Sequence, residues 1–125
     1  MINNSVIIAS NAGFLVDTLR EKLHDVDFRV IVANNDKDLS ARLKINYFRF
    51  VFIEQCFNAK GTDDYLHRIM KLHHDLHIVI WTASDIPTIE AVRYIHAGAE
   101  SFFSLRDTAE NLEKILIKIA NGLRS

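Results

Sequence analysis

The sequence predicts an α/β domain in which one parallel sheet is covered by helices on both faces. The most informative stretch is residues 50–54, four large apolar residues that end in Glu54. A run that is apolar on both faces is typical of a central strand in a parallel sheet. Four further short apolar runs alternate with segments whose apolar residues recur at helical spacing, as expected of repeated βα units. A carboxylate at the carboxyl end of a central strand lies where open α/β sheets place their functional sites.

The five predicted strands are residues 6–9, 28–32, 50–54, 78–81 and 101–103. A polar interruption in the second strand, at Arg29, favours an outer position for it. Right-handed crossovers leave few topologies for five βα units. The flavodoxin-like strand order 2-1-3-4-5 is the natural one at this length. We therefore expect a (βα)5 sandwich of three layers.

Apolar residues at helical spacing define the five predicted helices. Pro87 fits the first turn of the fourth helix, and Gly98 is expected to end it. The residues that define the helices are Leu15, Val16, Leu19 and Leu23; Leu39 and Leu43; Tyr65, Leu66, Ile69, Met70 and Leu72; Ile89, Val92 and Ile95; and Leu112, Ile115, Leu116 and Ile119.

The overall composition excludes several classes of protein. The 125 residues fit a single domain spanning 1–125, 49% hydrophobic and with a net charge of −1. No basic run is present, so direct nucleic-acid binding by this segment is not expected. Its apolar runs are shorter than the roughly 18 residues that a membrane span needs, and no signal peptide is recognisable. The single cysteine, Cys56, excludes an internal disulfide and suits a cytoplasmic location.

Two motifs resemble those of the receiver domains of bacterial two-component response regulators. His96-Ala97-Gly98-Ala99-Glu100-Ser101-Phe102 is similar to the Ala-Gly-Ala-x-x-aromatic approach to the fifth strand in that family. Thr82-Ala83 resembles the Thr/Ser-Ala ending of its fourth strand. The resemblance covers nearly the whole chain and implies the same fold and a role in signal transduction.

The resemblance also implies a phosphoacceptor pocket, and most of its positions are altered here. The family has two adjacent acids after the first strand, an acceptor Asp after the third, and a Lys followed by Pro after the fifth. This sequence has Ser10 and Asn11, Glu54, and Leu105 followed by Arg106 at those positions. Thr82 and the aromatic switch position, Phe102, keep the residue type of the family. We predict a degenerate pocket with no catalytic residue, no metal and no cofactor.

These departures remove the chemistry on which phosphoryl transfer depends. Mg²⁺ sites use one or two carboxylates with phosphate oxygens and water, whereas Ser10 and Asn11 bring no charge. Metal and ammonium groups neutralise the charge of the transferred group, and Leu105 has no ammonium. Glu54 is one methylene longer than Asp, and a misplacement of about one ångström costs a large factor in rate.

Two interpretations of Glu54 remain open. In one, its fixed charge mimics the phosphorylated state, although a phosphate has more charge and more acceptor oxygens. In the other, it is a carboxylate at the edge of the sheet that bonds to Ser10, Asn11 or Thr82 and has no signalling role.

We expect a phosphorylation-independent receiver-like domain that is not an enzyme and acts through protein–protein contact or dimerisation. The resemblance implies that the contact surface is the fourth helix, fifth strand and fifth helix, with Arg93, His96, Phe103, Arg106 and Lys114 as its residues. Two alternatives remain: an active phosphoacceptor that uses Glu54 or a nearby acid, and a small-ligand sensor whose altered rim binds a metabolite.

Two further expectations concern a histidine cluster and the end of the chain. His73 and His77 are four residues apart, but the predicted helix ends near Asp75, so a solvated helix end is expected in place of a metal site. Residues 118–125 resemble the end of receivers that precede a LuxR-type helix-turn-helix. We therefore expect a DNA-binding domain after Ser125, as in a transcription regulator.

Overall fold

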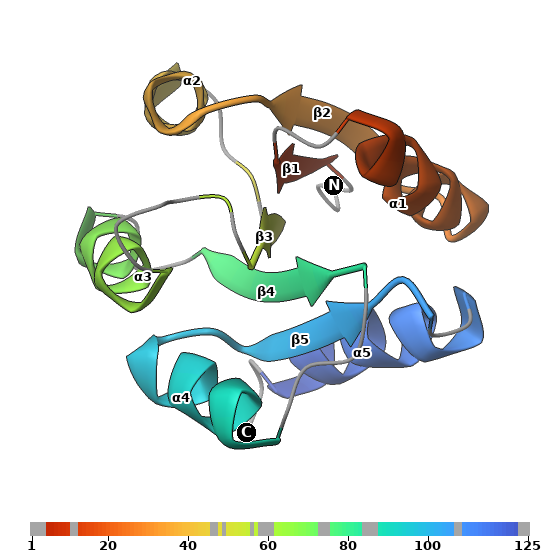
Figure 1. Ribbon diagram of the computed structural model, residues 1–125. Helices are drawn as coiled ribbons and strands as arrows, with labels where there is room; N and C mark the ends of the chain where they lie inside the picture. Colours follow the sequence, from red (N-terminus) through yellow and green to blue (C-terminus); the bar gives the residue numbers. More distant parts are fainter. Residues whose placement is uncertain are drawn as a thin grey trace.

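The computed structural model has one five-stranded parallel sheet between two layers of helices (Figure 1). It describes residues 5–10, 13–45, 48, 50–55, 57, 62–72, 76–83, 88–106 and 109–122. The strands lie in the order β2-β1-β3-β4-β5, and every pairing between neighbours is parallel. The predicted order 2-1-3-4-5 and the flavodoxin-like fold class are therefore confirmed.

Each predicted strand and helix is present, and the ends of the strands differ from the prediction by no more than one residue. The strands are β1 (Ser5–Ala9), β2 (Arg29–Ala33), β3 (Phe50–Glu54), β4 (His77–Thr82) and β5 (Ser101–Ser104). The helices are α1 (Gly13–Asp25), α2 (Asp36–Ile45), α3 (Thr62–Leu72), α4 (Thr88–Ala97) and α5 (Ala109–Gly122). No described helix has both the length and the apolar character that crossing a bilayer requires.

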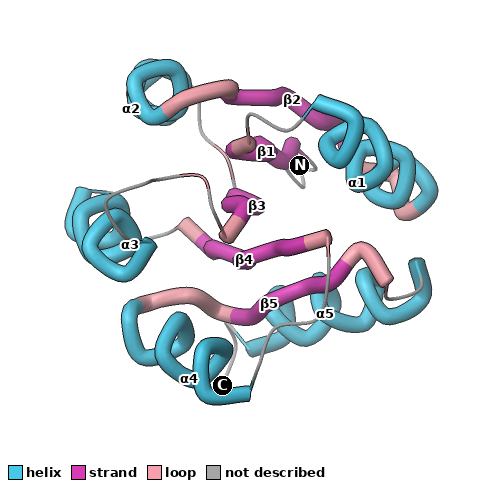
Figure 2. The backbone as a smooth tube through the Cα atoms, viewed as in Figure 1, coloured by secondary structure: helices cyan, strands magenta, loops and turns pink. Residues whose placement is uncertain are grey.

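Helices α1 and α5 cover one face of the sheet, and α2, α3 and α4 cover the other (Figure 2). Side chains of a strand alternate between the two faces, so each strand contributes to both cores. On β1, for example, Val6 and Ile8 pack toward α1 and α5, whereas Ile7 packs on the opposite side.

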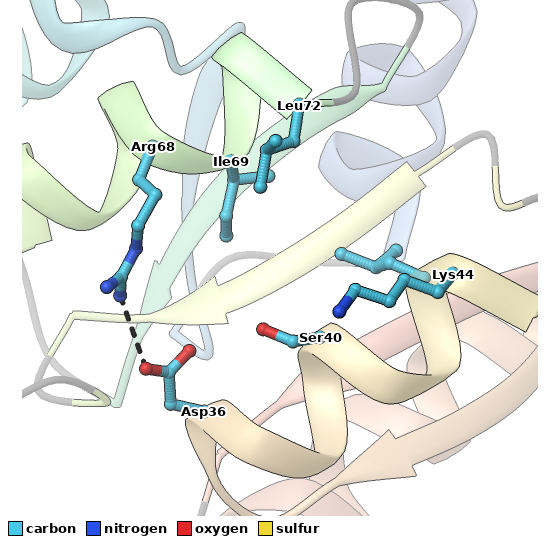
Figure 3. Close-up of a pocket in the computed structure, with 7 residues that line it drawn as sticks. Asp36, Ser40, Lys44, Arg68, Ile69 and Leu72 are labelled. Carbon is cyan, nitrogen blue, oxygen red and sulfur yellow. Dashed lines mark hydrogen bonds and ion pairs between the residues drawn. The ribbon is translucent and has the colours of Figure 1, made fainter.

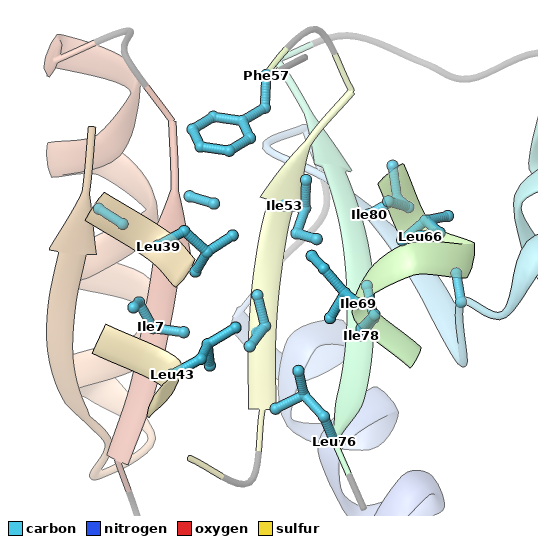
Figure 4. Packing of buried hydrophobic residues seen from close by; sticks show 14 of the residues in the cluster. Ile7, Leu39, Leu43, Ile53, Phe57, Leu66, Ile69, Leu76, Ile78 and Ile80 are labelled. Atoms are coloured by element: carbon cyan, nitrogen blue, oxygen red, sulfur yellow. The ribbon is translucent and has the colours of Figure 1, made fainter. Parts of the chain in front are cut away.

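The core under α2, α3 and α4 consists mainly of branched aliphatic side chains (Figure 4). Leu39 and Leu43 of α2 lie over β1 and β3, and Leu66 and Ile69 of α3 lie over β3 and β4. The core on the other face is more aromatic. It includes Phe50, Phe52, Trp81 and Phe103, all of them buried.

The central strands are buried as their sequences predict. All six residues of β4 and the first four of β3 are buried, whereas β2 begins with an exposed residue, as expected of an outer strand. Trp81 also satisfies its polar atom inside the core, because its Nε1 donates to the carbonyl oxygen of Phe52 at 3.2 Å. This bond fixes the only tryptophan of the chain between two central strands.

Local sequence signals explain several helix ends. Asn35 caps α2, since its Oδ1 accepts the backbone N–H of Asp38 at 2.8 Å. Gly98 follows α4 with a φ of 123°, a conformation that favours glycine. Asp27 takes the left-handed conformation after α1, with a φ of 69°, where glycine or asparagine is more usual.

One expectation about the histidines is wrong. His77 does not lie at a solvated helix end; it is the buried first residue of β4. Its Nδ1 lies 3.1 Å from Oε1 of Glu100, and its ring packs near Phe50. His73 lies outside the described residues.

Candidate functional site

Three polar side chains and one leucine lie where the carboxyl ends of four strands meet. Ser10 directly follows β1, Glu54 ends β3, Thr82 ends β4, and Leu105 directly follows β5. Because the strands are parallel and adjacent, these residues lie along one edge of the sheet, which we call the rim. Asn11 and Cys56 lie outside the described residues.

The most important contact at the rim joins Ser10 to Glu54. The register places Ala9 beside Ile53, so the next residues on the two strands are neighbours. The Ser10 hydroxyl donates to Oε1 of Glu54 at 2.7 Å, a short bond of the kind that carboxylates form with hydroxyl groups. Ser10 is fully buried, whereas Glu54 is partly exposed. Ser10 is therefore a hydrogen-bond partner of Glu54, as one of the three predicted possibilities stated.

The other two rim residues are joined through their backbones. The N–H of Leu105 donates to the carbonyl oxygen of Thr82 at 2.9 Å. Thr82 is buried, and the Leu105 side chain packs against the core on the α1 and α5 side. Leu105 thus extends the apolar core to the rim.

The described residues offer little to a metal ion. None of them form a group of three or more His, Cys, Asp or Glu side chains that could hold one. At the rim, the described side chains provide one carboxylate and two hydroxyl groups, and the carboxylate already accepts a bond from Ser10. A hard divalent cation is held more strongly by several charged oxygens.

Solved structures that resemble this chain include several response regulators. A CheY-like receiver domain from Methanospirillum hungatei matches with a TM-score of 0.79 and 16% identity over 98% of each chain. The receiver domain of a DNA-binding response regulator from Colwellia psychrerythraea gives a TM-score of 0.79 and 18% identity, over 94% of this chain and 98% of that one. A response regulator from Burkholderia pseudomallei, crystallised with a phosphorylated aspartic acid and a calcium ion, gives 0.77 and 16%, over 97% of this chain and 71% of that one.

The chain has the receiver-domain fold. A scan of protein-family models finds no match, and neither does a search of curated proteins. At such low identities the structural likeness establishes the fold.

In this receiver fold, β5 is one of the two edge strands, with α4 against one face of the sheet and α5 against the other (Figure 1). Four of the five residues predicted for the contact surface are exposed: Arg93, His96, Arg106 and Lys114. The prediction for the fifth residue, Phe103, is wrong. It is fully buried among the aromatic side chains on the α1 and α5 side, so it cannot contact a partner.

The exposed aromatic residue of β5 is Phe102. Neighbouring residues of a strand point to opposite faces, and the pairing of Phe103 with Trp81 directs Phe103 into the core. Phe102 is 40% exposed. Its predicted role as a switch aromatic stays a prediction.

Sequence reasoning did not single out the apolar surface of α4. This helix buries Ala91, Tyr94 and Ala97, all with small or polar-tipped side chains. Its large apolar residues Ile89, Val92 and Ile95 are 81%, 48% and 42% exposed. The sequence does contain a signal for this orientation. Ala91, Tyr94 and Ala97 form a second set of residues at helical spacing, and their side chains suit close packing against the sheet.

Away from the rim, α2 and α3 border a shallow groove that contains a cavity of about 160 Å³ (Figure 3). Leu43, Ile69 and Leu72 form its apolar part. Lys44 and Arg68 bring positive charge, and Arg68 Nη2 lies 3.2 Å from Oδ2 of Asp36 across the groove. Asp36 and Ser40 complete the lining.

Proposed function

We propose that this chain is a phosphorylation-independent receiver-like domain that acts by protein–protein contact, with a second copy of the chain as its partner. The contact surface comprises the exposed side chains of α4, β5 and α5. The observation that carries the proposal is the set of large apolar side chains that α4 and β5 leave outside the core, namely Ile89, Val92, Ile95 and Phe102. Exposed apolar groups that gather in one region mark interaction sites, whereas scattered ones do not.

Charged side chains on the same elements suit a symmetric pair. Arg93, Arg106 and Lys114 are exposed, and so are the acids Glu110 and Glu113 of α5. In a twofold contact the same surface faces itself, so a surface with both signs of charge can pair with its own copy. Lys114 and Glu110 form an ion pair at 3.5 Å, and both side chains are exposed. Such an exposed pair is weak, so each residue can pair with the opposite charge of a second copy instead.

The rim supports independence from phosphorylation. The residues present do not fit Mg²⁺, because a hydroxyl and an amide replace the acid pair and Glu54 is occupied by Ser10. No ammonium is available at Leu105 to neutralise a phosphoryl group. We therefore favour a rim whose state does not depend on phosphorylation over the alternative of an active phosphoacceptor at Glu54.

The test is sedimentation of the wild-type chain and two variants over a range of concentrations. We expect a reversible dimer in the wild type and a monomer in Val92→Glu, because a carboxylate would be buried in the apolar contact. Ile45→Glu is the matched control: Ile45 is 79% exposed at the end of α2, on another part of the surface. A wild-type chain that stays monomeric, or a dimer that only Ile45→Glu disrupts, contradicts the proposal.

Dimerisation would serve to position a further module. The Colwellia neighbour is described as the receiver domain of a DNA-binding response regulator, and two paired receivers would place two helix-turn-helix units on successive half-sites. We propose that such a module follows residue 125 in the complete protein. The reading frame after that codon tests this directly, because a stop codon there removes the module.

A second candidate function is small-ligand sensing, favoured by the groove between α2 and α3. Its volume of about 160 Å³ is below the roughly 300–1,000 Å³ of ordinary ligand pockets, so only a small ligand fits. Lys44 and Arg68 together outweigh Asp36 in charge, which suits a monoanion with a short hydrocarbon part. An NMR titration with benzoate would shift the amides of α2 and α3 in the wild type and less in Lys44→Gln. Unchanged spectra would rule this candidate out.

A further inference from the structure

The side chain of Gln55 joins the end of β3 to α4. Gln55 directly follows Glu54, and its backbone N–H donates to the carbonyl oxygen of Trp81 at 2.9 Å. Its side-chain Nε2 donates to Oε2 of Glu90 at 2.9 Å and to the hydroxyl oxygen of Tyr94 at 3.1 Å. Glu90 and Tyr94 are four residues apart, so they lie on the same side of α4 one turn apart. One amide group thus holds two successive turns of the helix.

These bonds matter because the apolar attachment of α4 is small. Two of its three buried side chains are alanines, Ala91 and Ala97, and burial free energy scales with apolar area. The larger aliphatic side chains of the helix face solvent. Among the α4 side chains whose burial is described, Tyr94 is the one large buried side chain, and it is also an acceptor for Gln55. The amide therefore adds two hydrogen bonds to the apolar contacts that attach α4 to the sheet.

The contacts form a continuous series from the rim to the surface. Ser10 bonds to Glu54, and Glu54 is covalently joined to Gln55. Gln55 bonds to Tyr94, and the guanidinium carbon of Arg93 lies 5.4 Å from the centre of the Tyr94 ring, within the range of a cation–π contact. Arg93 is exposed on the proposed contact surface.

We infer that Gln55 is a positioning residue whose amide transmits the state of the Ser10–Glu54 pair to α4. This inference rests on the proposed function for its biological meaning, because three of the four apolar side chains of the proposed contact surface lie on α4. When Ser10 holds Glu54, the end of β3 is fixed and the amide reaches both Glu90 and Tyr94. When that bond is lost, the end of β3 moves, the amide contacts loosen, and Ile89 and Val92 shift with the helix. Coupling of this kind is reciprocal, so a partner bound to α4 would also stabilise the Ser10–Glu54 pair.

The experiment is amide hydrogen exchange, measured residue by residue in the full chain at a dilution where it is monomeric. The variants are Ser10→Ala, Gln55→Leu and the double variant. Gln55→Leu keeps the size of the side chain and removes its bonds, so exchange within α4 should rise roughly three- to tenfold. Ser10→Ala should also raise exchange within α4, and it should add no further increase when Gln55→Leu is present. Amides of α2, which none of these contacts reaches, are the internal control.

Tyr94→Phe provides a milder variant that keeps the ring in the core. It should raise α4 exchange less than Gln55→Leu, and its effect should largely disappear when the two changes are combined, because they remove the same bond. If Ser10→Ala leaves α4 exchange unchanged, or raises it equally with and without Gln55, the inference is wrong. Because the readout is on the monomer, a failure to dimerise would refute the proposed function alone, and a failure of the exchange test would refute the coupling alone.

Discussion

The hydroxyl of Ser10 donates to Oε1 of Glu54 at 2.7 Å, across the boundary between two central strands. Ser10 is fully buried, and the carboxylate is partly exposed. Ser10→Ala should therefore lower the free energy of unfolding by about 1 kcal/mol, the usual value of such a bond when water can still reach one partner.

Urea unfolding followed by the fluorescence of Trp81, the only tryptophan, measures this change. Ser40→Ala is the control, because Ser40 is exposed on α2 and its loss should stay within about 0.5 kcal/mol. Equal effects of the two substitutions would mean that the bond to Glu54 contributes nothing to stability.

Magnesium should not stabilise the wild-type fold. A cation that binds only the native state raises the melting temperature by mass action. The described side chains of the rim provide one carboxylate, that of Glu54, which already accepts a hydrogen bond from Ser10. Thermal melting with and without Mg²⁺ measures this. A melting temperature that rises with Mg²⁺, and rises less in Glu54→Gln, would show that the rim binds the ion after all.

Beryllofluoride should leave the amide spectrum unchanged. This phosphoryl analogue needs cations to hold it, and Leu105, the residue that follows β5 at the rim, is apolar and packs against the core. Two-dimensional NMR reports on Glu54, Thr82 and Phe102 individually. Shifts confined to these residues on addition of beryllofluoride would instead support an active phosphoacceptor site.

The fold followed from the sequence because its signals are local and strong. Residues 50–54 are apolar on both sides, and the structure buries four of them at the centre of the sheet. Arg29, a polar residue in an otherwise apolar run, marked β2 as an outer strand, and it is exposed at the start of that strand. Which segments form strands, and which strands are central, depends on such patterns of apolar and polar residues, and these patterns can be read from the sequence alone.

The contact surface was harder to predict, because it depends on which side of an element faces the sheet. The apolar spacing in residues 89–95 identified α4, but the same helix has a second periodic set, and that set is the buried one. Phe102 and Phe103 are chemically identical neighbours, and only their register against Trp81 decides which is buried. The two hydrogen bonds from Gln55 to α4 span sequence separations of 35 and 39 residues. No local sequence pattern predicts contacts over such separations.

The two phenylalanines of β5 should respond differently to truncation. Phe103 is fully buried, so Phe103→Ala should cost about 3–5 kcal/mol of unfolding free energy. Phe102 is 40% exposed, so Phe102→Ala should cost only about 1 kcal/mol while weakening any dimer. Chemical denaturation and sedimentation of both variants separate the two roles. A larger loss of stability for Phe102→Ala would contradict the register of β5.

Gly98 should be difficult to replace, for two separable reasons. Its φ of 123° is a conformation that L side chains rarely adopt, and a Cβ there would lie 3.1 Å from Cγ of Met70. Gly98→Ala should therefore destabilise the fold by about 1–3 kcal/mol. Gly13→Ala is the matched control, since a Cβ at Gly13 meets nothing within 4 Å, and it should be neutral or slightly stabilising.

Combining Gly98→Ala with Met70→Ala distinguishes the two causes by a double-mutant cycle. Removal of the Met70 side chain relieves the steric contact, so the cost of the alanine at position 98 should fall in that background. It should not fall to zero, because the backbone strain remains. A cost that disappears entirely would mean that Met70 alone requires glycine at the end of α4, and an unchanged cost would mean that the conformation alone does.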